Sequence, residues 1–181
     1  YGNVSRVSAP GEMKYSYTYD PEIHTYPIQV QNNLDYISKT EYDYRWGKPL
    51  STTDINNNII HYSYDHRGRI IKIRGPYEHD YTMKFYYSVD DRRWTWDLSG
   101  NVAKAKTLHY DPANPENPMT TISFSNGFTM NQVKKDMEVA GLEVMNVSGW
   151  EIRDFLLRVV RQYDPDIENI GTQNYKYRTN N

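Results

Sequence analysis

Residues 60–76 read IHYSYDHRGRIIKIRGP, and this stretch decides the fold. Aromatic and β-branched residues recur at every second position on both sides of residues 65–68, DHRG, which is the pattern of two antiparallel strands joined by a turn. Gly68 can adopt the positive φ that a short hairpin loop requires. The Asp65 carboxylate can accept hydrogen bonds from backbone amides of the turn, and Arg69 opens the returning strand. The stretch therefore predicts a β-hairpin.

Parts of this hairpin recur along the chain. The dipeptide Tyr-Asp begins at positions 19, 42, 64, 110 and 163, at intervals of 23, 22, 46 and 53 residues. The third interval is twice the first and the fourth is near two units with an insertion, so a unit of two strands and their turns runs through the chain. Residues 94–101, WTWDLSGN, keep the same order with Trp in place of Tyr. The predicted repeat motif consists of Tyr19, Asp20, Tyr42, Asp43, Tyr62, Tyr64, Asp65, Gly68, Arg69, Trp94, Trp96, Asp97, Gly100, Tyr110, Asp111, Tyr163 and Asp164.

The repeat predicts a mainly β chain of successive antiparallel hairpins. Residues 1–118 carry clear repeats and residues 119–181 carry degenerate ones. Short helices near the C-terminus stay open as an alternative, because Met130, Val133, Met137 and Ala140 also match helical spacing. Two alternatives likewise stay open for residues 152–163. The phase of the repeat predicts a turn at residues 154–157 followed by a strand, whereas apolar residues at helical spacing fit one face of a short helix. The phase of the repeat favours the hairpin.

Composition excludes several classes of partner. The chain has 21 basic and 23 acidic residues, a formal net charge of -2 and no cysteine. It therefore offers no broad positive surface for nucleic acid, no disulfide and no thiolate metal site. No apolar run is long enough to insert into a membrane. A mean hydropathy of -0.88 with 18 tyrosines favours a sheet wall over a thick core.

Residues 62–69, YSYDHRGR, resemble the unit of the RHS or YD-repeat family, Tyr-x-Tyr-Asp-x-x-Gly-Arg followed by alternating apolar residues, at every fixed position. Residues 17–20 keep the first half of that unit, and residues 53–57 are similar to the family's Thr-Asp-x-Asn-Gly turn with Asn57 in place of Gly. Residues 148–165 resemble later units of bacterial RHS toxins, although Leu157 stands where the family has Gly. The resemblance covers most of the chain.

The resemblance implies a long antiparallel sheet wound spirally into a hollow shell, as in insecticidal toxin-complex components, RHS polymorphic toxins and teneurins. In bacterial members the shell encloses a toxic C-terminal domain. The chain, which opens at Tyr1 without a starting Met or a leader, would then be an excised piece of the wall of a secreted or cell-surface bacterial protein. Its partners would be neighbouring repeats of the parent chain and an enclosed toxin domain, with no cofactor, no metal and no enzymatic activity.

Other functions compete with this interpretation. An aromatic-rich sheet could bind glycans or a receptor as part of an adhesin, and the contact residues expected in that case are Trp46, Trp94, Trp96 and Trp150. A small effector enzyme after residue 119 is a third hypothesis, based on the weaker repeat pattern there. The Tyr-Asp pairs do not favour acid-base catalysis, because a reaction centre needs one converging group of residues and not a copy in each repeat. His61 and His66 with Asp65 are a weak candidate for a metal site.

Overall fold

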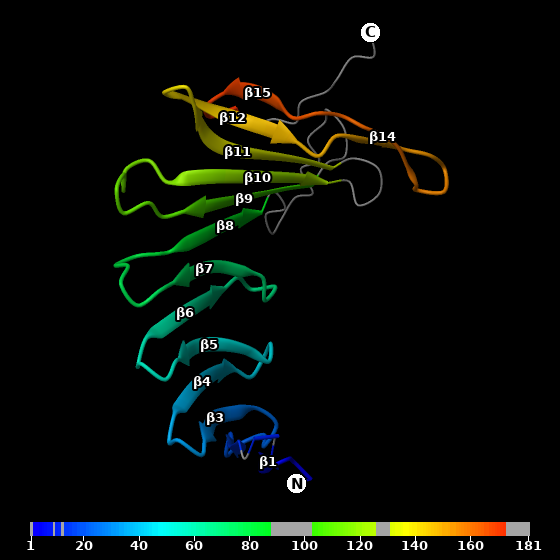
Figure 1. Ribbon diagram of the computed structural model, residues 1–181. Coiled ribbons are helices and arrows are strands. Elements are labelled where there is room, and N and C mark those ends of the chain that lie inside the picture. Colours follow the sequence, from blue (N-terminus) through cyan, green and yellow to red (C-terminus); the bar gives the residue numbers. More distant parts are fainter. Residues whose placement is uncertain (1, 9, 12, 88–102, 126–130, 173–181) are drawn as a thin grey trace. The chain divides into compact units, whose positions relative to one another are not determined.

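The computed structural model describes residues 2–8, 10–11, 13–87, 103–125 and 131–172, which form strands joined by turns (Figure 1). The chain divides into two compact units, Tyr1–Thr82 and Met83–Asn181. Each unit is described by itself. The described residues contain no helix long and apolar enough to cross a membrane.

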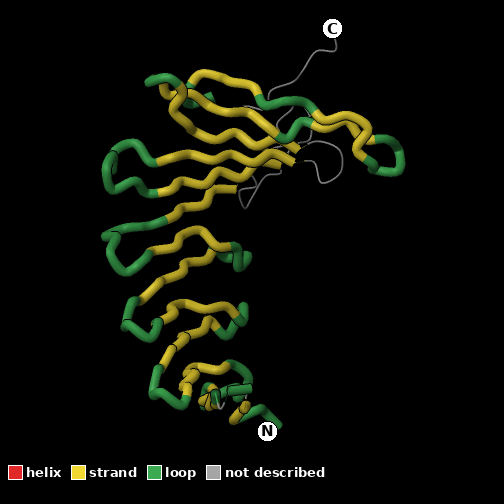
Figure 2. The backbone as a smooth tube through the Cα atoms, in the orientation of Figure 1, coloured by secondary structure: helices red, strands yellow, loops and turns green. Residues whose placement is uncertain are grey.

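Unit 1 is an antiparallel ladder in which each strand pairs with the next one in the sequence. The turns consequently alternate between the two ends of the strands. Figure 2 shows these turns in green. No apolar side chain in the described part of this unit is fully buried. Unit 1 is therefore a single sheet with half-buried faces. Its strands are β1 (Arg6–Ser8), β2 (Lys14–Tyr19), β3 (Pro27–Asn32), β4 (Ile37–Asp43), β5 (Lys48–Thr53), β6 (Ile59–Tyr64) and β7 (Ile70–Arg74).

Unit 2 contains an antiparallel ladder and one separate hairpin. The ladder runs in the order β8 (Met83–Tyr87), β9 (Ala103–His109), β10 (Met119–Ser125), β11 (Asn131–Val139), β12 (Leu142–Ser148) and β15 (Asp166–Asn169). The separate hairpin pairs β13 (Glu151–Arg153) with β14 (Val159–Gln162). Apolar side chains of β10 and β12 form the buried core, which consists of Ile122, Phe124, Met145 and Val147, with Trp150 following β12.

The predicted mainly β fold of antiparallel hairpins is confirmed. The helix alternative for residues 152–163 is wrong, because hydrogen bonds at residues 154–158 close a turn there and the flanking residues pair as β13 and β14. The apolar residues that suggested a helical face are exposed instead, with Phe155 at 90%. Their spacing matched a helix without the burial that a helical face needs.

Candidate functional site

One turn geometry occurs four times in the described chain. A five-residue segment begins with Asp or Asn, whose side-chain Oδ1 accepts hydrogen bonds from the backbone amides of the third and fifth residues at 2.8–3.0 Å. The fourth residue has positive φ and donates its amide to the carbonyl oxygen of the first. The four turns begin at Asn32, Asp54, Asp65 and Asp154.

Each turn keeps its geometry with a different residue at the left-handed position. Gly68 has φ 73°, and Asp35, Asn57 and Leu157 take the same position with φ between 60° and 63°. Glycine adopts this conformation without steric cost, whereas other residues adopt it only when surrounding interactions hold them there. The carboxylate or amide cap therefore stabilises the turn even where glycine is missing.

A β-bulge precedes the capping aspartate in four hairpins. The register shifts between Thr18 and Tyr19, between Glu41 and Tyr42, between Ser63 and Tyr64, and between Ile152 and Arg153. An extra residue at that point bends and twists the strand as it enters the turn. In the first three of these hairpins a tyrosine of the repeat motif lies at the bulge, next to the capping carboxylate.

Asp20 closes a longer loop between β2 and β3 and is buried. Its Oδ1 accepts the amides of Glu22, Ile23 and His24 at 2.6–3.2 Å, and its Oδ2 accepts those of Thr25 and Tyr26, both at 2.9 Å. Burial alone would raise the pKa of Asp20, but the backbone donors outweigh it and hold this pKa well below the ordinary value. Asp20 is therefore an ionised structural cap.

The other capping carboxylates follow the same electrostatic rule. Burial would raise the pKa of Asp65, but backbone and side-chain donation from Arg69, with the amide of Arg67, lowers it. Hydrogen bonds from the Arg158 side chain lower the pKa of Asp154, and those from the Asn58 side chain lower that of Asp54. These carboxylates are ionised at neutral pH and are committed to their own turns, so they are poor proton donors.

Turns at the same end of the strands in unit 1 contact each other in series. The Tyr26 ring, in the loop after β2, stacks on Tyr42 with centroids 4.9 Å apart and on Tyr44 at 5.9 Å. A Cβ placed on Gly47, in the turn after β4, would lie 2.6 Å from the Tyr26 hydroxyl. The loop after β2 is thereby packed against the turn after β4.

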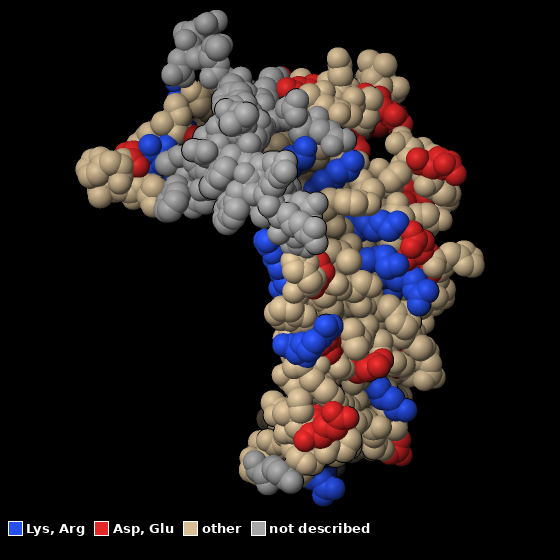
Figure 3. Space-filling model, turned by 180° about the vertical axis from the view of Figure 1, so that it is seen from behind, with Lys and Arg blue, Asp and Glu red and all other residues tan. Residues whose placement is uncertain are grey.

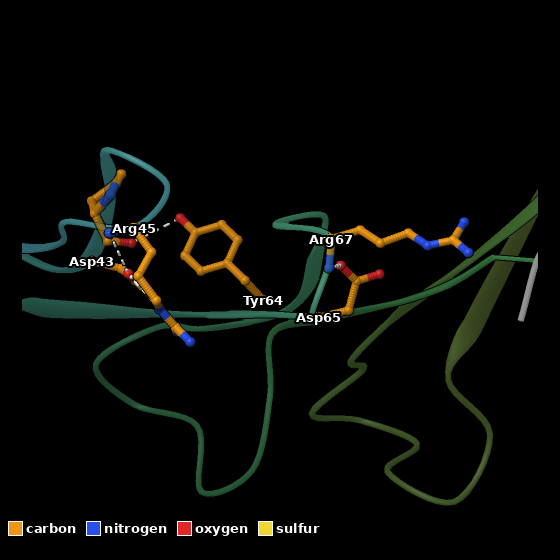
Figure 4. A network of polar contacts seen from close by, with 6 residues as sticks. Asp43, Arg45, Tyr64, Asp65 and Arg67 are labelled. Carbon is orange, nitrogen blue, oxygen red and sulfur yellow. Dashed lines mark hydrogen bonds and ion pairs between the residues drawn. The ribbon is translucent and has the colours of Figure 1, made fainter. Parts of the chain in front are cut away.

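The turn after β4 contacts the turn after β6 in a similar way. Trp46 lies against Gly68, where a Cβ would come within 2.7 Å of the indole Cδ2, and the Lys48 ammonium donates to the Gly68 carbonyl. Tyr64 donates its hydroxyl to the Pro49 carbonyl at 2.8 Å. Figure 4 shows Tyr64 directed from its own turn toward the turn that holds Asp43 and Arg45. Aromatic rings and glycines, among them the motif residues Tyr42, Tyr64 and Gly68, thus join one hairpin to the next.

The remaining motif residues differ in how closely they follow this arrangement. The Asp43 Oδ1 accepts the amide of Arg45 at 2.9 Å, and its carboxylate pairs with the Arg45 guanidinium. The Asp111 Oδ1 accepts a hydrogen bond from one turn amide, that of Ala113, at 2.9 Å. Tyr163 follows β14 and has the Arg161 guanidinium 5.0 Å from its ring centroid. The carboxylate that caps the β13–β14 turn belongs to Asp154 and not to Asp164.

Trp94, Trp96, Asp97 and Gly100 lie outside the described residues. Of the other tryptophans predicted to contact glycans, Trp46 is 41% exposed and Trp150 is 5% exposed. The Trp150 ring therefore offers almost no surface to a sugar.

Sequence reasoning missed Asn32 and Asp154 as caps, although it placed a turn at residues 154–157. The signal was available in unit 1, because Asp or Asn occurs at positions 20, 32, 43, 54 and 65, at intervals of 11 or 12 residues that mark successive turns. It also missed a buried polar row on β11, formed by Gln132 and Lys134.

No converging reaction centre is visible in the described parts of the chain. They contain no group of three or more His, Asp or Glu residues placed to hold a metal ion. On the face shown in Figure 3, basic and acidic residues are interspersed over each unit. The site that the geometry presents is thus a series of capped turns with aromatic contacts between them.

Comparison with known proteins supports the fold. No protein-family model matches the sequence, and no curated protein matches it significantly. A chain in the crystal structure of TcdB2-TccC3-Cdc42 superposes with a TM-score of 0.68 at 16% sequence identity, over 85% of this chain and 12% of that chain. This chain therefore has the fold of a short stretch of a much longer solved protein.

Proposed function

We propose that this chain is a structural segment of a bacterial secreted or cell-surface protein of the RHS type. In this proposal its Tyr-Asp hairpins form part of the wall of an encapsulating β-shell that holds or presents a toxin or effector. Its partners are the neighbouring repeats of the parent chain and the enclosed domain. The segment itself carries no catalytic role.

The observation that carries the proposal is the serial contact between turns at one end of the strands in unit 1. Tyr26 stacks on Tyr42, and Trp46 packs on Gly68, so each hairpin is fixed to the next. Such a ladder is stabilised by nearest-neighbour contacts and can continue for many repeats without a thick core. Each hairpin also covers the strand edge of the previous one, which prevents edge-to-edge aggregation.

Three further observations support the proposal. The sequence of residues 62–69 resembles the unit of the RHS family. The fold is similar to a stretch that makes up 12% of a much longer chain, which suits a repeating wall better than a complete domain. The turn carboxylates are committed to backbone amides, which favours a structural role for the Tyr-Asp pairs.

The test uses the parent protein with its enclosed domain. Deleting residues 59–76 removes the β6–β7 hairpin from the ladder, so we expect the enclosed domain to become sensitive to limited proteolysis. The matched control shortens residues 112–117, between β9 and β10, which leaves the paired strands in place and should preserve protection. Unchanged protection after the hairpin deletion would refute the shell proposal.

A glycan- or receptor-binding module is the second candidate, because Trp46 keeps 41% of its surface exposed. A glycan array with the wild-type chain and with Trp46→Ala tests it. Binding that disappears in the variant favours the binding module, whereas binding that ignores Trp46 favours the shell. The third hypothesis, an effector enzyme after residue 119, receives little support from a ladder in which β10 pairs directly with β9.

A further inference from the structure

The two faces of the unit 1 ladder differ in chemical character. Side chains alternate between the faces along each strand, and residues opposite each other on neighbouring strands share a face. The register therefore assigns one face, which we call the polar face, to Ser16, Gln29, Lys39, Ser51, His61 and Lys72, one residue from each of β2 to β7. The tyrosines of these strands all lie on the opposite face, namely Tyr15, Tyr17, Tyr19, Tyr42, Tyr62 and Tyr64.

The polar face has an excess of positive charge. Away from the bulges its strand residues include one carboxylate, Glu41, and five cations, which are Arg6, Lys14, Lys39, Lys72 and Arg74. Glu41 accepts a hydrogen bond from the Ser51 hydroxyl at 3.3 Å, and Lys72 pairs with Asp80 at 3.5 Å. Within the described part of the chain, the other four cations form no ion pair.

The carboxylates that could neutralise these cations are engaged in the turns. Asp20, Asp54 and Asp65 accept hydrogen bonds from the backbone amides of their own loops. Asp35 accepts a hydrogen bond from the Gln31 side chain at 2.9 Å. Turning any of them toward a strand cation would cost those bonds. The positive charge of the polar face is therefore left for a partner to neutralise.

The polar face is accessible, because unit 1 is a single sheet. Arg6, Lys14 and Lys39 are exposed, and Gln29 and Gln31 lie half-buried between them. A glutamine amide both donates and accepts hydrogen bonds, as a peptide group does. At one end of this face Arg6, Lys14, Ser16 and Gln31 line a common hollow of the surface. Cations thus alternate with side chains that can pair with a polypeptide backbone.

We propose that the polar face of unit 1 binds an acidic polypeptide segment in an extended conformation. Carboxylates of the segment pair with Arg6, Lys14, Lys39 and Arg74, and its peptide groups pair with the glutamine amides. The distance from β1 to β7 is six strand spacings, about 29 Å. An extended chain covers that distance with about nine residues. This binding does not depend on the shell, so it is tested with the 181-residue chain itself.

The distribution of side chains favours a peptide over other polyanions. The tyrosines of the strands, whose rings could stack on sugars, all lie on the opposite face. Duplex nucleic acid carries a negative charge for about every 1.7 Å of its axis, whereas the four unpaired cations are distributed over the width of seven strands. A segment with an acidic residue at every second position has a charge density closer to that of this face.

Fluorescence anisotropy at low ionic strength tests the proposal, because screening is weak there. The probe is a fluorescein-labelled peptide of alternating Glu and Ser, about twelve residues long so that it exceeds the span of the face. The full chain should bind this peptide and should not bind the corresponding peptide of alternating Gln and Ser. Lys39→Gln with Arg74→Gln removes two of the four unpaired cations and should weaken binding on the order of tenfold.

A second double variant controls for net charge. Arg67→Gln with Lys135→Gln removes the same two kinds of cation from exposed positions outside the polar face, so binding should be unchanged. Circular dichroism confirms that both double variants are folded. The proposal is overturned if the acidic peptide does not bind, if the Gln peptide binds equally well, or if the two double variants weaken binding to the same extent. It is also overturned if a sulfated oligosaccharide or an oligothymidylate displaces the peptide from the polar face and binds there more tightly.

Discussion

Replacing Gly68 by alanine tests whether the contact between neighbouring turns stabilises the ladder. Two costs add at this position. The backbone φ of 73° lies in the left-handed region, which disfavours a residue with a Cβ by about 1–2 kcal/mol. The new Cβ would also lie 2.7 Å from Cδ2 and 2.9 Å from Cε3 of Trp46, and displacing a packed ring costs about 1–3 kcal/mol.

Gly68→Ala should therefore lower the free energy of unfolding by about 2–5 kcal/mol, read from urea denaturation followed by circular dichroism and tryptophan fluorescence. Gly11→Ala is the matched control, because Gly11 has φ 79° and no neighbouring atom within 4 Å of the added Cβ. It should show the backbone cost alone, about 1–2 kcal/mol.

A double-mutant cycle isolates the contact with Trp46. In a Trp46→Ala background, Gly68→Ala should cost no more than Gly11→Ala, since the ring that the new Cβ would meet is gone. The reasoning is refuted if Gly68→Ala and Gly11→Ala are equally costly, or if the cost at Gly68 is the same with and without the indole.

Three further predictions concern the caps. Leu157→Gly should raise the free energy of unfolding by about 0.5–1 kcal/mol by relieving the left-handed backbone, whereas Leu156→Gly in the same turn should lower it; equal effects in urea denaturation would contradict this. Asp54→Asn should cost less stability than Asp54→Ala, because an amide oxygen still accepts the two turn amides, as Asn32 does in its own turn; thermal unfolding of both variants compares them. Because the pKa of Asp20 is lower in the folded chain than in the unfolded chain, its stabilisation is complete above about pH 4 and decreases as the pH falls further; Asp20→Asn should flatten stability against pH in that range, and an unchanged slope would count against it.

The hairpins were predictable because their determinants are local. Residues 65–69 contain the cap, the glycine and the arginine of one turn within five positions, and the structure uses all three there. Leu157 shows the limit of that reasoning. Its identity argues against a left-handed residue, yet Asp154 makes the same two hydrogen bonds as Asp65 and closes the same turn. The cap, more than the glycine, is the better signal in this chain.

The contacts between elements could not be predicted from pattern. Trp46 and Gly68 meet because their two turns lie at the same end of the strands. The identities of the two residues alone do not reveal this contact. Lys134 lies in a strand whose neighbours in sequence, Val133 and Lys135, are exposed. Nothing in that alternation distinguishes a buried lysine from a solvated one, because its counterion comes from β15, 34 residues later.

The alternation of turns between the two ends of the strands determines how such a chain can change length. Inserting or losing a block of 22 residues, the spacing between Tyr42 and Tyr64, adds or removes two strands and keeps each later Tyr-Asp turn on its original side. Inserting one strand would transfer all later motifs to the opposite side and separate the stacking partners. Such a chain can therefore grow by duplicating pairs of strands, whereas the gain or loss of an odd number of strands is disfavoured.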